Sequence, residues 1–292
     1  GYCEMVNSAE QGGVVLHHAI QSTMAGKGVS VLVIPGDVST QEAEEDTFTS
    51  SVISSGRPVV YPDPAEAAAL TQAINEAKTV ALFVGAGVKD AREQVLALAE
   101  KIKAPIGHAL GGKMYIQYEN PFDVGMNGLL GYGAAHEATH EADLLILLGT
   151  DFPYNDFLPD ANVAQVDING SHIGRRTKIS YPVTGDVAAT IENILPHVDE
   201  KKDRSFLDKM LKKHYGKLEH VVEAYTSNVD KHTPIHPEYV ADLIDKNADE
   251  DAIFTVDTGM CNVWGARYIT ANGKREQIGS FRHGTMANAL PQ

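Results

Sequence analysis

Several features that mark particular protein classes are scarce or absent. The 292 residues include only two cysteines, Cys3 and Cys261, which cannot build a disulfide framework, and no secretory signal pattern is present. Both absences predict a reducing, cytoplasmic environment. The longest apolar runs, such as Leu144–Leu148, are far shorter than the ~20 residues that span a bilayer.

Positive charge is also in short supply. Lysine and arginine number 24 against 39 aspartates and glutamates, so the formal net charge is −15 at pH 7. A chain with this charge repels phosphate backbones, which excludes nucleic acid as an expected partner and disfavours an anionic membrane surface for this segment. The sequence also has no Gly-x-Ser-x-Gly elbow, P-loop or Cys-x-x-Cys pair. Nothing therefore supports catalysis by a serine or cysteine nucleophile.

What the sequence does contain is a regular alternation of helical and β-branched segments. Runs rich in apolar and β-branched residues, such as 29–34 and 79–84, are typical of strands buried on both faces. Five expected strands within 79–184, separated by helices, predict an α/β fold with a doubly wound parallel sheet. The expected strands are 29–34, 79–84, 104–109, 144–149, 163–168, 181–184, 253–256 and 277–281, and the expected helices are 8–26, 64–77, 90–102, 131–140, one from 188, 198–232 and 237–245.

The same pattern divides the chain into parts. Polar residues 39–60 lack periodicity and are expected to form a linker. Asp63 and Pro64, an N-cap followed by the first helical residue, mark the start of a complete domain. Both termini lie inside patterned elements, and 286–292 is typical of a helix start, so we expect a central portion of a longer protein. The four expected parts are a tail at 1–45, a middle domain at 57–197, a charged helical connection at 198–234 and the head of another domain at 235–292.

Two features at expected strand ends are typical of nucleotide sites. Gly85-Ala86-Gly87 follows a strand and precedes a helix, where backbone N–H groups can approach a phosphate. Asp90 stands where the third glycine of the dinucleotide fingerprint would be, so a tight strand-to-helix turn is an equal alternative. Asp167 ends another strand and can accept hydrogen bonds from a ribose diol. The alternative, slightly favoured by the residues alone, is that Asp167 starts the turn at Asn169-Gly170.

Two glycine-punctuated loops, 125–131 and 149–154, are more unusual. Both are expected outside the carboxyl ends of strands, which is where open α/β sheets bind ligands. The aromatic rings of Phe152 and Tyr154 are suited to wall a flat ring system. The alternative is that both rings are satellite core, the commoner role of aromatic residues in loops.

The histidines raise the question of a metal site. His136 and His140 are four residues apart with Glu137 after the first, which matches the H-E-x-x-H pattern of zinc hydrolases. The motif is short, lacks an evident third ligand and lies between glycine loops. We therefore expect a partly exposed helix face and no metal site, either here or at the other histidines considered, His17, His18 and His108.

Five segments, in their order along the chain, carry a family resemblance that covers essentially its whole length. Val33–Val38 resembles the end of the pyrimidine-binding domain of thiamine-diphosphate enzymes, and Phe281–Asn288 resembles the opening of their pyrophosphate-binding domain. Lys103–Ile106, Asn120–Met126 and Leu148–Tyr154 resemble the middle domain of the pyruvate oxidases. The family is that of the thiamine-diphosphate- and FAD-dependent pyruvate oxidases, and the quinone-reducing members are the most similar.

This resemblance implies a DHS-like, FAD-binding middle domain flanked by partial α/β thiamine-enzyme domains. It assigns Gly284, Thr285 and Met286 to thiamine diphosphate, with Met286 as the apolar wedge that holds the cofactor bent. No catalytic residue and no metal ligand is implied within the chain. The implied flavin contacts are Asn127, Gly128, Leu129, Leu130, Thr150, Asp151, Phe152, Pro153, Tyr154, Asp167 at the ribose and Gly85 at the glycine turn.

For the whole enzyme, the resemblance implies oxidative decarboxylation of pyruvate with thiamine diphosphate, Mg²⁺ and FAD, and electron transfer to a membrane quinone. It also implies a homotetramer attached peripherally, through its C-terminus, to the inner face of the cell membrane. The family's activating glutamate and its magnesium-binding Gly-Asp-Gly…Asn segment have no counterpart here, so we expect the chain alone to be inactive. Two alternatives stay open: an acetohydroxyacid synthase-like carboligase with structural FAD, and a nucleotide-binding module without chemistry.

Overall fold

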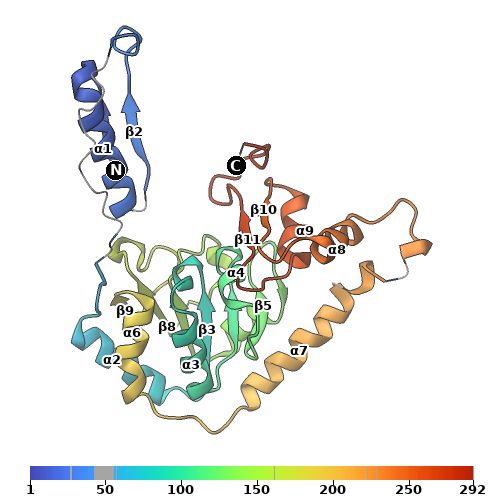
Figure 1. Cartoon of the computed structure of the whole chain (residues 1–292). Helices are drawn as coiled ribbons and strands as arrows, with labels where there is room; N and C mark the ends of the chain where they lie inside the picture. The colour runs from blue at the N-terminus through green and yellow to red at the C-terminus, as the bar shows by residue number, and fades with distance from the viewer. Residues whose placement is uncertain are drawn as a thin grey trace. The chain divides into compact units, whose positions relative to one another are not determined.

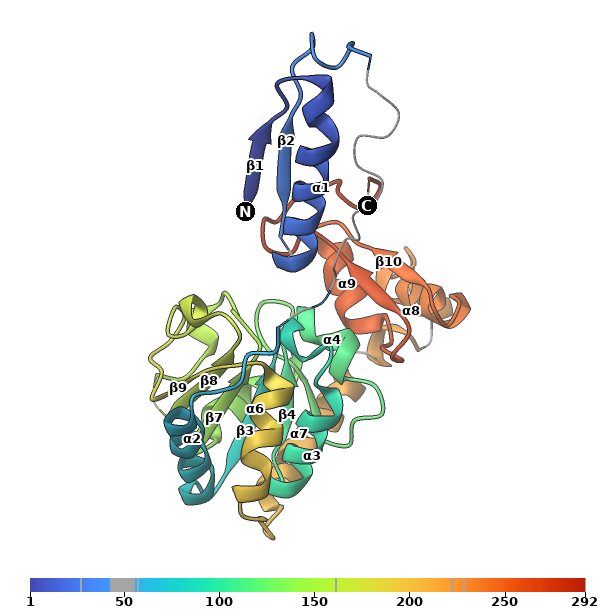
Figure 2. The ribbon, with the colours of Figure 1, turned by 60° about the vertical axis from the view of Figure 1, so that its left-hand side comes forward.

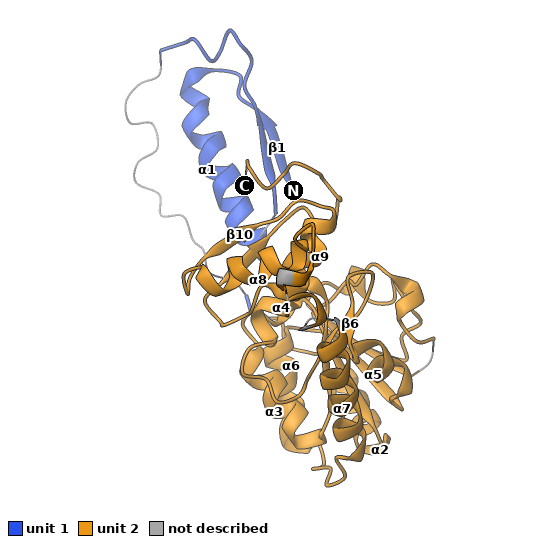
Figure 3. Ribbon diagram, turned by 90° about the vertical axis from the view of Figure 1, so that its right-hand side faces the viewer, with its two compact units in different colours: residues 1–59 blue, residues 60–292 orange. Residues whose placement is uncertain are grey.

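The described chain forms two compact units, residues 1–59 and 60–292, which are coloured separately in Figure 3. The computed structural model describes these residues except 27, 43–55, 57, 161, 222, 228 and 292. Most of the expected linker 39–60 therefore lies outside the described residues. Within the described part, no helix combines the length and the apolar character that crossing a membrane requires.

The first unit is a small α/β layer. Helix α1 (Ala9–Gly26) and strand β2 (Ser30–Val33) lie where the pattern predicts them. A strand that the pattern does not predict, β1 (Tyr2–Met5), precedes them and pairs in parallel with β2. Its residues, Tyr2-Cys3-Glu4-Met5, form neither a continuous apolar run nor a strict alternation of apolar and polar residues. The small core of the unit consists of Val6, Val15 and Val38.

The second unit is built on a seven-stranded sheet with the order β6-β5-β4-β3-β7-β8-β9 (Figure 1). All neighbouring strands are parallel except the edge pair β5–β6. Without β6, the strands ranked by their position in the chain have the order 3-2-1-4-5-6, which is a doubly wound sheet, as predicted. The strands are β3 (Val80–Val84), β4 (Ile106–His108), β5 (Asp123–Met126), β6 (Tyr132–Gly133), β7 (Leu144–Leu148), β8 (Val163–Asp167) and β9 (Tyr181–Thr184).

Helices cover both faces of this sheet because its central strands are apolar on both sides. In β3, Val80, Leu82 and Val84 face one layer, whereas Ala81 and Phe83 face the other. Helices α2, α3 and α6 pack on the first face (Figure 2), and α5 and α7 pack on the second. The bounds are α2 (Pro64–Glu76), α3 (Arg92–Ile102), α5 (Ala135–Glu141), α6 (Val187–Ile194) and α7 (Ser205–Val221).

Helix α2 begins as the sequence predicts, with Asp63 as its N-cap. The Asp63 carboxylate accepts hydrogen bonds from the amides of Ala65 (2.8 Å) and Glu66 (3.4 Å), and Pro64 takes the first helical position. The variant Asp63→Ala should therefore lower the free energy of unfolding by about 1 kcal/mol, as measured by urea denaturation followed by circular dichroism. Asp63→Asn is the control, because an amide oxygen also caps helices. An equal loss in both variants would contradict a capping role.

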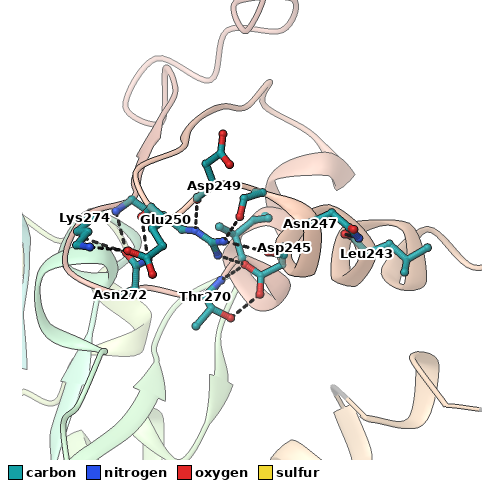
Figure 4. A network of polar contacts seen from close by, with 12 residues as sticks. Leu243, Asp245, Asn247, Asp249, Glu250, Thr270, Asn272 and Lys274 are labelled. Carbon is teal, nitrogen blue, oxygen red and sulfur yellow. Dashed lines mark hydrogen bonds and ion pairs between the residues drawn. The ribbon is translucent and has the colours of Figure 1, made fainter.

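Residues 237–278 add a smaller α/β layer. Strand β10 (Ile253–Thr255) pairs in parallel with β11 (Glu276–Ile278), and helices α8 (Pro237–Asn247) and α9 (Met260–Tyr268) accompany them. A polar network centred on Asp245 at the end of α8 ties this layer together (Figure 4). The Asp245 carboxylate accepts hydrogen bonds from the Thr270 amide (2.7 Å), the Thr270 hydroxyl (2.6 Å) and the Arg275 guanidinium (2.7 Å). The network therefore fixes α8 against the chain between α9 and β11.

The charged connection differs from its prediction. Residues 198–232 do not form one helix, since α7 occupies only Ser205–Val221 and single 3-10 turns follow it. The residues before α7 are held to the first helical layer instead. There the Lys201 amide donates to Lys101 O (3.0 Å) and its ammonium donates to Ala77 O (2.6 Å).

Other differences involve short, glycine-containing elements. The pattern does not predict β5, β6, α9 or α4 (Leu110–Ile116), each of which contains glycine and is nine residues or shorter. The expected helix at 131–140 begins later, at Ala135, because Tyr132 and Gly133 pair with β5. The expected helix start at 286–292 is wrong for the described residues 286–291, which form turns, and Ala287 has a φ of +57°. The boundaries expected within 57–292 stay a prediction.

Candidate functional site

The strand order reverses between β3 and β7, and the loops that leave these two strands touch. Gly149, at φ +57°, lies so close to Gly87 that a Cβ atom on either residue would stand 2.6 Å from the other's Cα atom. The amides of Gly85 and Gly87 donate hydrogen bonds to Leu148 O (3.1 Å) and Gly149 O (2.9 Å). The crevice in which open α/β sheets bind ligands lies at such a reversal.

Gly85 itself is buried in a tight turn. A Cβ atom at this position would meet the Thr150 Cβ atom at 2.6 Å, so packing alone requires glycine here. Because the Gly85 and Gly87 amides are already paired, a phosphate at this turn would need other donors. The geometry is that of the tight-turn alternative, and the flavin contact expected at Gly85 stays a prediction.

The loop after β5 and the loop after β7 lie side by side. Gly128, at φ +105°, packs against the rings of Phe152 and Tyr154, where its Cβ atom would stand 3.0 and 3.2 Å from them. Buried Asn127 anchors the loop, since its side chain donates to Phe157 O (2.9 Å) and accepts from the Gly128 amide (2.9 Å). The structure thus brings together Asn127–Leu130 and Thr150–Tyr154, the two stretches predicted to contact flavin.

Their side chains divide into core and rim. Phe152 is buried, with its ring centroid 5.0 Å from that of Phe83, so it has the satellite-core role that the sequence left open. Leu129 and Tyr154 are 67% and 36% exposed, and Pro153 is exposed beside them. Only the rim residues therefore offer apolar surface to a flat ring.

A pair of arginines holds Asp151. The Arg176 guanidinium lies 3.0 Å from one carboxylate oxygen and Arg175 lies 3.5 Å from the other. Burial opposes ionisation of this carboxyl, but the hydrogen bond and charge of Arg176, followed by the charges of Arg175 and His172, lower the pKa of Asp151 below its ordinary value. The sequence analysis missed both arginines. Their adjacency, soon after the turn that follows β8, is the signal that was available.

Asp167 ends β8 at the same sheet edge. One oxygen accepts a hydrogen bond from the Asn169 amide (2.9 Å), so Asp167 does start the turn of the alternative interpretation. The other oxygen lies 3.4 Å from His172 Nδ1. The two roles are compatible, because only the first oxygen is committed to the backbone; the ribose role stays a prediction.

The H-E-x-x-H motif lies on α5. Its two histidines are exposed, and His140 Nδ1 lies 2.9 Å from the His136 carbonyl oxygen. The Glu137 carboxylate pairs with the Lys217 ammonium of α7. Among the described residues, no group of three or more His, Cys, Asp or Glu side chains could hold a metal ion. The geometry of this motif is therefore that of a helix face with an interhelical ion pair.

A buried ionisable cluster lies beneath the β5 loop, and the sequence analysis did not identify it. The Asp123 carboxylate oxygens are 3.6 Å from His108 Nε2 and 3.9 Å from His214 Nε2. His214 enters from α7 between Gly125 (φ +92°) and Gly133 (φ +76°), where a Cβ atom on Gly133 would stand 2.2 Å from His214 Nδ1. Glycine at these two positions therefore admits the imidazole ring.

Burial dominates the protonation of this cluster. It raises the pKa of Asp123 to about 7, against the hydrogen bond that the carboxylate accepts from the Gly125 amide. It lowers the pKa of His108 to about 3 and that of His214 to about 4. On α4, burial also lowers the pKa of Lys113 to about 8. The cluster links strands β4 and β5 to helix α7 below the candidate flavin loop.

The three residues assigned to thiamine diphosphate lie in a turn after β11. Gly284, at φ +63°, donates to Ser280 O (2.8 Å), and the Ser280 hydroxyl donates to the Thr285 hydroxyl (3.0 Å). The Thr285 carbonyl accepts a hydrogen bond from the Thr258 amide (3.4 Å), which ties the turn to the end of β10. Met286 is 76% exposed, so its side chain has surface to offer a cofactor.

Known proteins resemble this chain over most of its length. An uncharacterized 42.6 kDa protein of Pseudomonas amyloderamosa is 43% identical over 74% of this chain and 54% of its own length. The "Putative thiamine pyrophosphate-containing protein YdaP" of Bacillus subtilis is 32% identical over 98% of this chain and 49% of its own. The chain thus spans about half the length of the curated relatives it matches.

Relatives with a named reaction match at lower identity. Acetolactate synthase of Mycobacterium bovis is 28% identical over 98% of this chain and 48% of its own length. Pyruvate oxidase of Lactiplantibacillus plantarum is 24% identical over 95% of this chain and 46% of its own.

The fold has a counterpart among solved structures. The X-ray structure of "a putative thiamin diphosphate-dependent enzyme" from Mycobacterium smegmatis matches with a TM-score of 0.69 at 20% identity, over 99% of this chain and 54% of that one. The family described as "Thiamine pyrophosphate enzyme, central domain" matches residues 67–194, which contain all seven strands of the large sheet. Residues 67–194 are therefore a central domain of the thiamine pyrophosphate enzyme family.

Proposed function

We propose that this chain supplies the FAD-binding middle of a thiamine-diphosphate-dependent enzyme that oxidatively decarboxylates pyruvate to acetate and CO2. One observation carries the flavin part: the Gly128 loop packs on the Tyr154 loop beside the strand reversal, at the sheet edge where Asp167 ends its strand. This is the position at which doubly wound sheets bind dinucleotides.

The groups at this edge suit both halves of FAD. The Arg175 and Arg176 guanidinium groups suit a diphosphate, to which arginine binds through paired N–H donors, and the Asp167 carboxylate suits a ribose diol. Exposed Leu129 and Tyr154 give apolar surface to a flat ring. Bound FAD would supply a two-electron acceptor. The residues of the chain bind it, orient it and shield it from water.

Asp167→Asn tests the flavin proposal. The variant keeps an oxygen for the Asn169 amide but removes the charged acceptor, so FAD should bind about tenfold more weakly with an unchanged urea midpoint. Titration of the purified chain into FAD, monitored by quenching of FAD fluorescence, measures the dissociation constants of the wild type and of Asp167→Asn. Asp160→Ala, at an exposed carboxylate before β8, is the control and should bind like the wild type. A wild-type chain that does not quench FAD at all would contradict the proposal.

The reaction itself has a second candidate. Acetolactate synthase matches at a higher identity than pyruvate oxidase, 28% against 24%, which favours a carboligase with structural FAD. The segments Gly149–Tyr154 and His283–Met286 resemble the oxidases instead. Product analysis with pyruvate, on the protein as its own cells make it, separates the two: acetate supports the oxidase, and acetolactate supports the carboligase.

The remaining parts of the proposal concern partners of the whole enzyme. We extend it to thiamine diphosphate with Mg²⁺ as the cofactor at the Gly284–Met286 side, and to a membrane quinone as electron acceptor. A homotetramer with peripheral attachment to the inner face of the cell membrane completes it. Reduction of a soluble quinone analogue, coupled to pyruvate consumption, is the direct test of the electron acceptor.

A further inference from the structure

The loop after β5 makes a specific contact with the small α/β layer. Arg267 on α9 donates from Nη2 to Gly131 O at 3.2 Å, between residues 136 positions apart in the chain. Gly131 is the last residue of the glycine loop whose stretch Asn127–Leu130 is proposed to contact flavin. The contact therefore joins one proposed cofactor segment to a helix outside the central domain.

The local geometry of the loop makes this carbonyl important. The Gly131 amide donates to Gly128 O (2.8 Å), which closes a tight turn. A Cβ atom on Gly131 would stand 2.7 Å from Gly128 O and 2.9 Å from Met126 O, so the turn has no room for a side chain. The Gly131 amide thus forms the hydrogen bond within the turn, and the Gly131 carbonyl accepts the hydrogen bond that Arg267 donates from α9. Loss of that bond removes the restraint that α9 places on the turn.

Helix α9 is firmly seated where it makes this contact. Ala266, which is 0% exposed, packs with Met126 and Tyr132 on either side of the loop. Lys113 of α4, which is 1% exposed, donates to the carbonyls of Ile269 and Gly265 at the C-terminal end of α9. A cation at a helix C-terminus stabilises the helix. The position of Arg267 is thus fixed from the central domain itself.

The same layer also holds the segment assigned to thiamine diphosphate. The Asp257 carboxylate, just after β10, accepts a hydrogen bond from the Ala289 amide (2.8 Å), and the Thr258 amide donates to the Thr285 carbonyl (3.4 Å). Helix α9 begins at Met260, directly after these residues. A displacement of α9 therefore affects both the glycine loop and the Thr285 turn.

We propose that Arg267 is a positioning residue that orders the Asn127–Gly131 loop for its ligand and couples that loop to the docking of α9. The ligand part rests on the proposed flavin function. Because coupling of two sites is reciprocal, flavin binding in turn stabilises the docked α9. Arg267 acts through the loop and not by touching the reacting atoms.

The test compares Arg267→Met, Arg267→Lys and Lys89→Met in the full 292-residue chain. Methionine keeps an apolar stem but removes the guanidinium donor, whereas lysine replaces the guanidinium by an ammonium group that can still donate. Lys89 makes a different contact between the central domain and the small layer, an ion pair 3.5 Å from Glu276, and does not touch the loop. Hydrogen–deuterium exchange of peptides covering 125–133 reports loop order without any cofactor. FAD affinity by fluorescence quenching is the second readout.

We expect exchange in 125–133 to rise about tenfold in Arg267→Met, with partial recovery in Arg267→Lys and no change in Lys89→Met. FAD affinity should fall by about tenfold in Arg267→Met. It should fall less in Arg267→Lys and stay unchanged in Lys89→Met. Unchanged exchange in Arg267→Met overturns the proposal. So does raised exchange in Arg267→Met if this variant and the wild type bind FAD with equal affinity. If the wild type binds no FAD, the proposed function fails, and the exchange result still decides whether Arg267 orders the loop.

Discussion

Gly149→Ala should lower the free energy of unfolding by about 3–5 kcal/mol, a large loss for one added methyl group. Two costs coincide at this position. Gly149 has φ +57°, which L-residues other than glycine adopt at a cost, and its new Cβ atom would stand 2.6 Å from the Gly87 Cα atom. Neither backbone can move away, because the Gly87 amide bonds to Gly149 O across the strand reversal.

Two further glycines separate these costs. Gly87→Ala creates the same backbone overlap at 2.6 Å and should cost about 2–3 kcal/mol. Gly174→Ala has φ +76° with nothing within 4 Å of its Cβ position, and should cost about 1 kcal/mol. Urea denaturation followed by circular dichroism measures all three. If Gly149→Ala cost no more than Gly174→Ala, the two loops would not be in contact.

The second large effect is a loss of stability in mild acid. Between about pH 4 and pH 6.5 the folded chain keeps His108 and His214 neutral, because burial lowers their pKa values to about 3 and about 4. The unfolded chain binds protons at both histidines. Asp123 opposes this, because its folded pKa is raised to about 7 and it holds a proton that the unfolded chain has released. Near pH 5 the unfolded state thus binds about one proton more in total.

Stability must therefore fall as the pH falls through this window. One excess proton corresponds to about 1.4 kcal/mol per pH unit, and the excess grows from a fraction of a proton at pH 6.5 to about one at pH 5. Lowering the pH from 6.5 to 5 should therefore cost about 1.4 kcal/mol. His214→Gln removes one of the two histidine terms and should leave the free energy of unfolding nearly independent of pH here. Asp123→Asn removes the opposing term and should roughly double the slope. Urea midpoints at a series of pH values measure the slopes, and equal slopes in all three proteins would disprove this account.

The sheet of the central domain could be predicted because its strands carry their own signal. Strands buried on both faces, such as Leu144–Leu148, are continuous apolar runs that need no tertiary information to be recognised. Asp63 is also local, since an N-cap bonds to amides two and three residues away. By contrast, β5 and β6 depend on Gly125 and Gly133, whose positive φ angles and contacts with His214 exist only in the folded chain.

The candidate site divides in the same way. The loops at Asn127 and Thr150 were predicted from their glycines and their place after strands, and the sheet does bring them together. Arg176 bonds to Asp151, 25 positions away, and Arg267 bonds to Gly131, 136 positions away. No local sequence pattern specifies such pairs. For Phe152 the residue type alone allowed a ligand wall or core, and only its contact with Phe83 assigns it to the core.

The bond between Arg267 and Gly131 also has a consequence for synthesis on the ribosome. A growing chain emerges at roughly 5–20 residues per second, so the 136 residues that separate the two partners take roughly 7–27 s to make. The seven-stranded sheet is complete well before that, but its glycine loop lacks the hydrogen bond from Arg267 until α9 has left the exit tunnel. Loading of the proposed cofactor on a nascent chain would therefore lag behind folding of the sheet, whose last strand ends at Thr184, by the time needed to translate from Thr184 to Arg267.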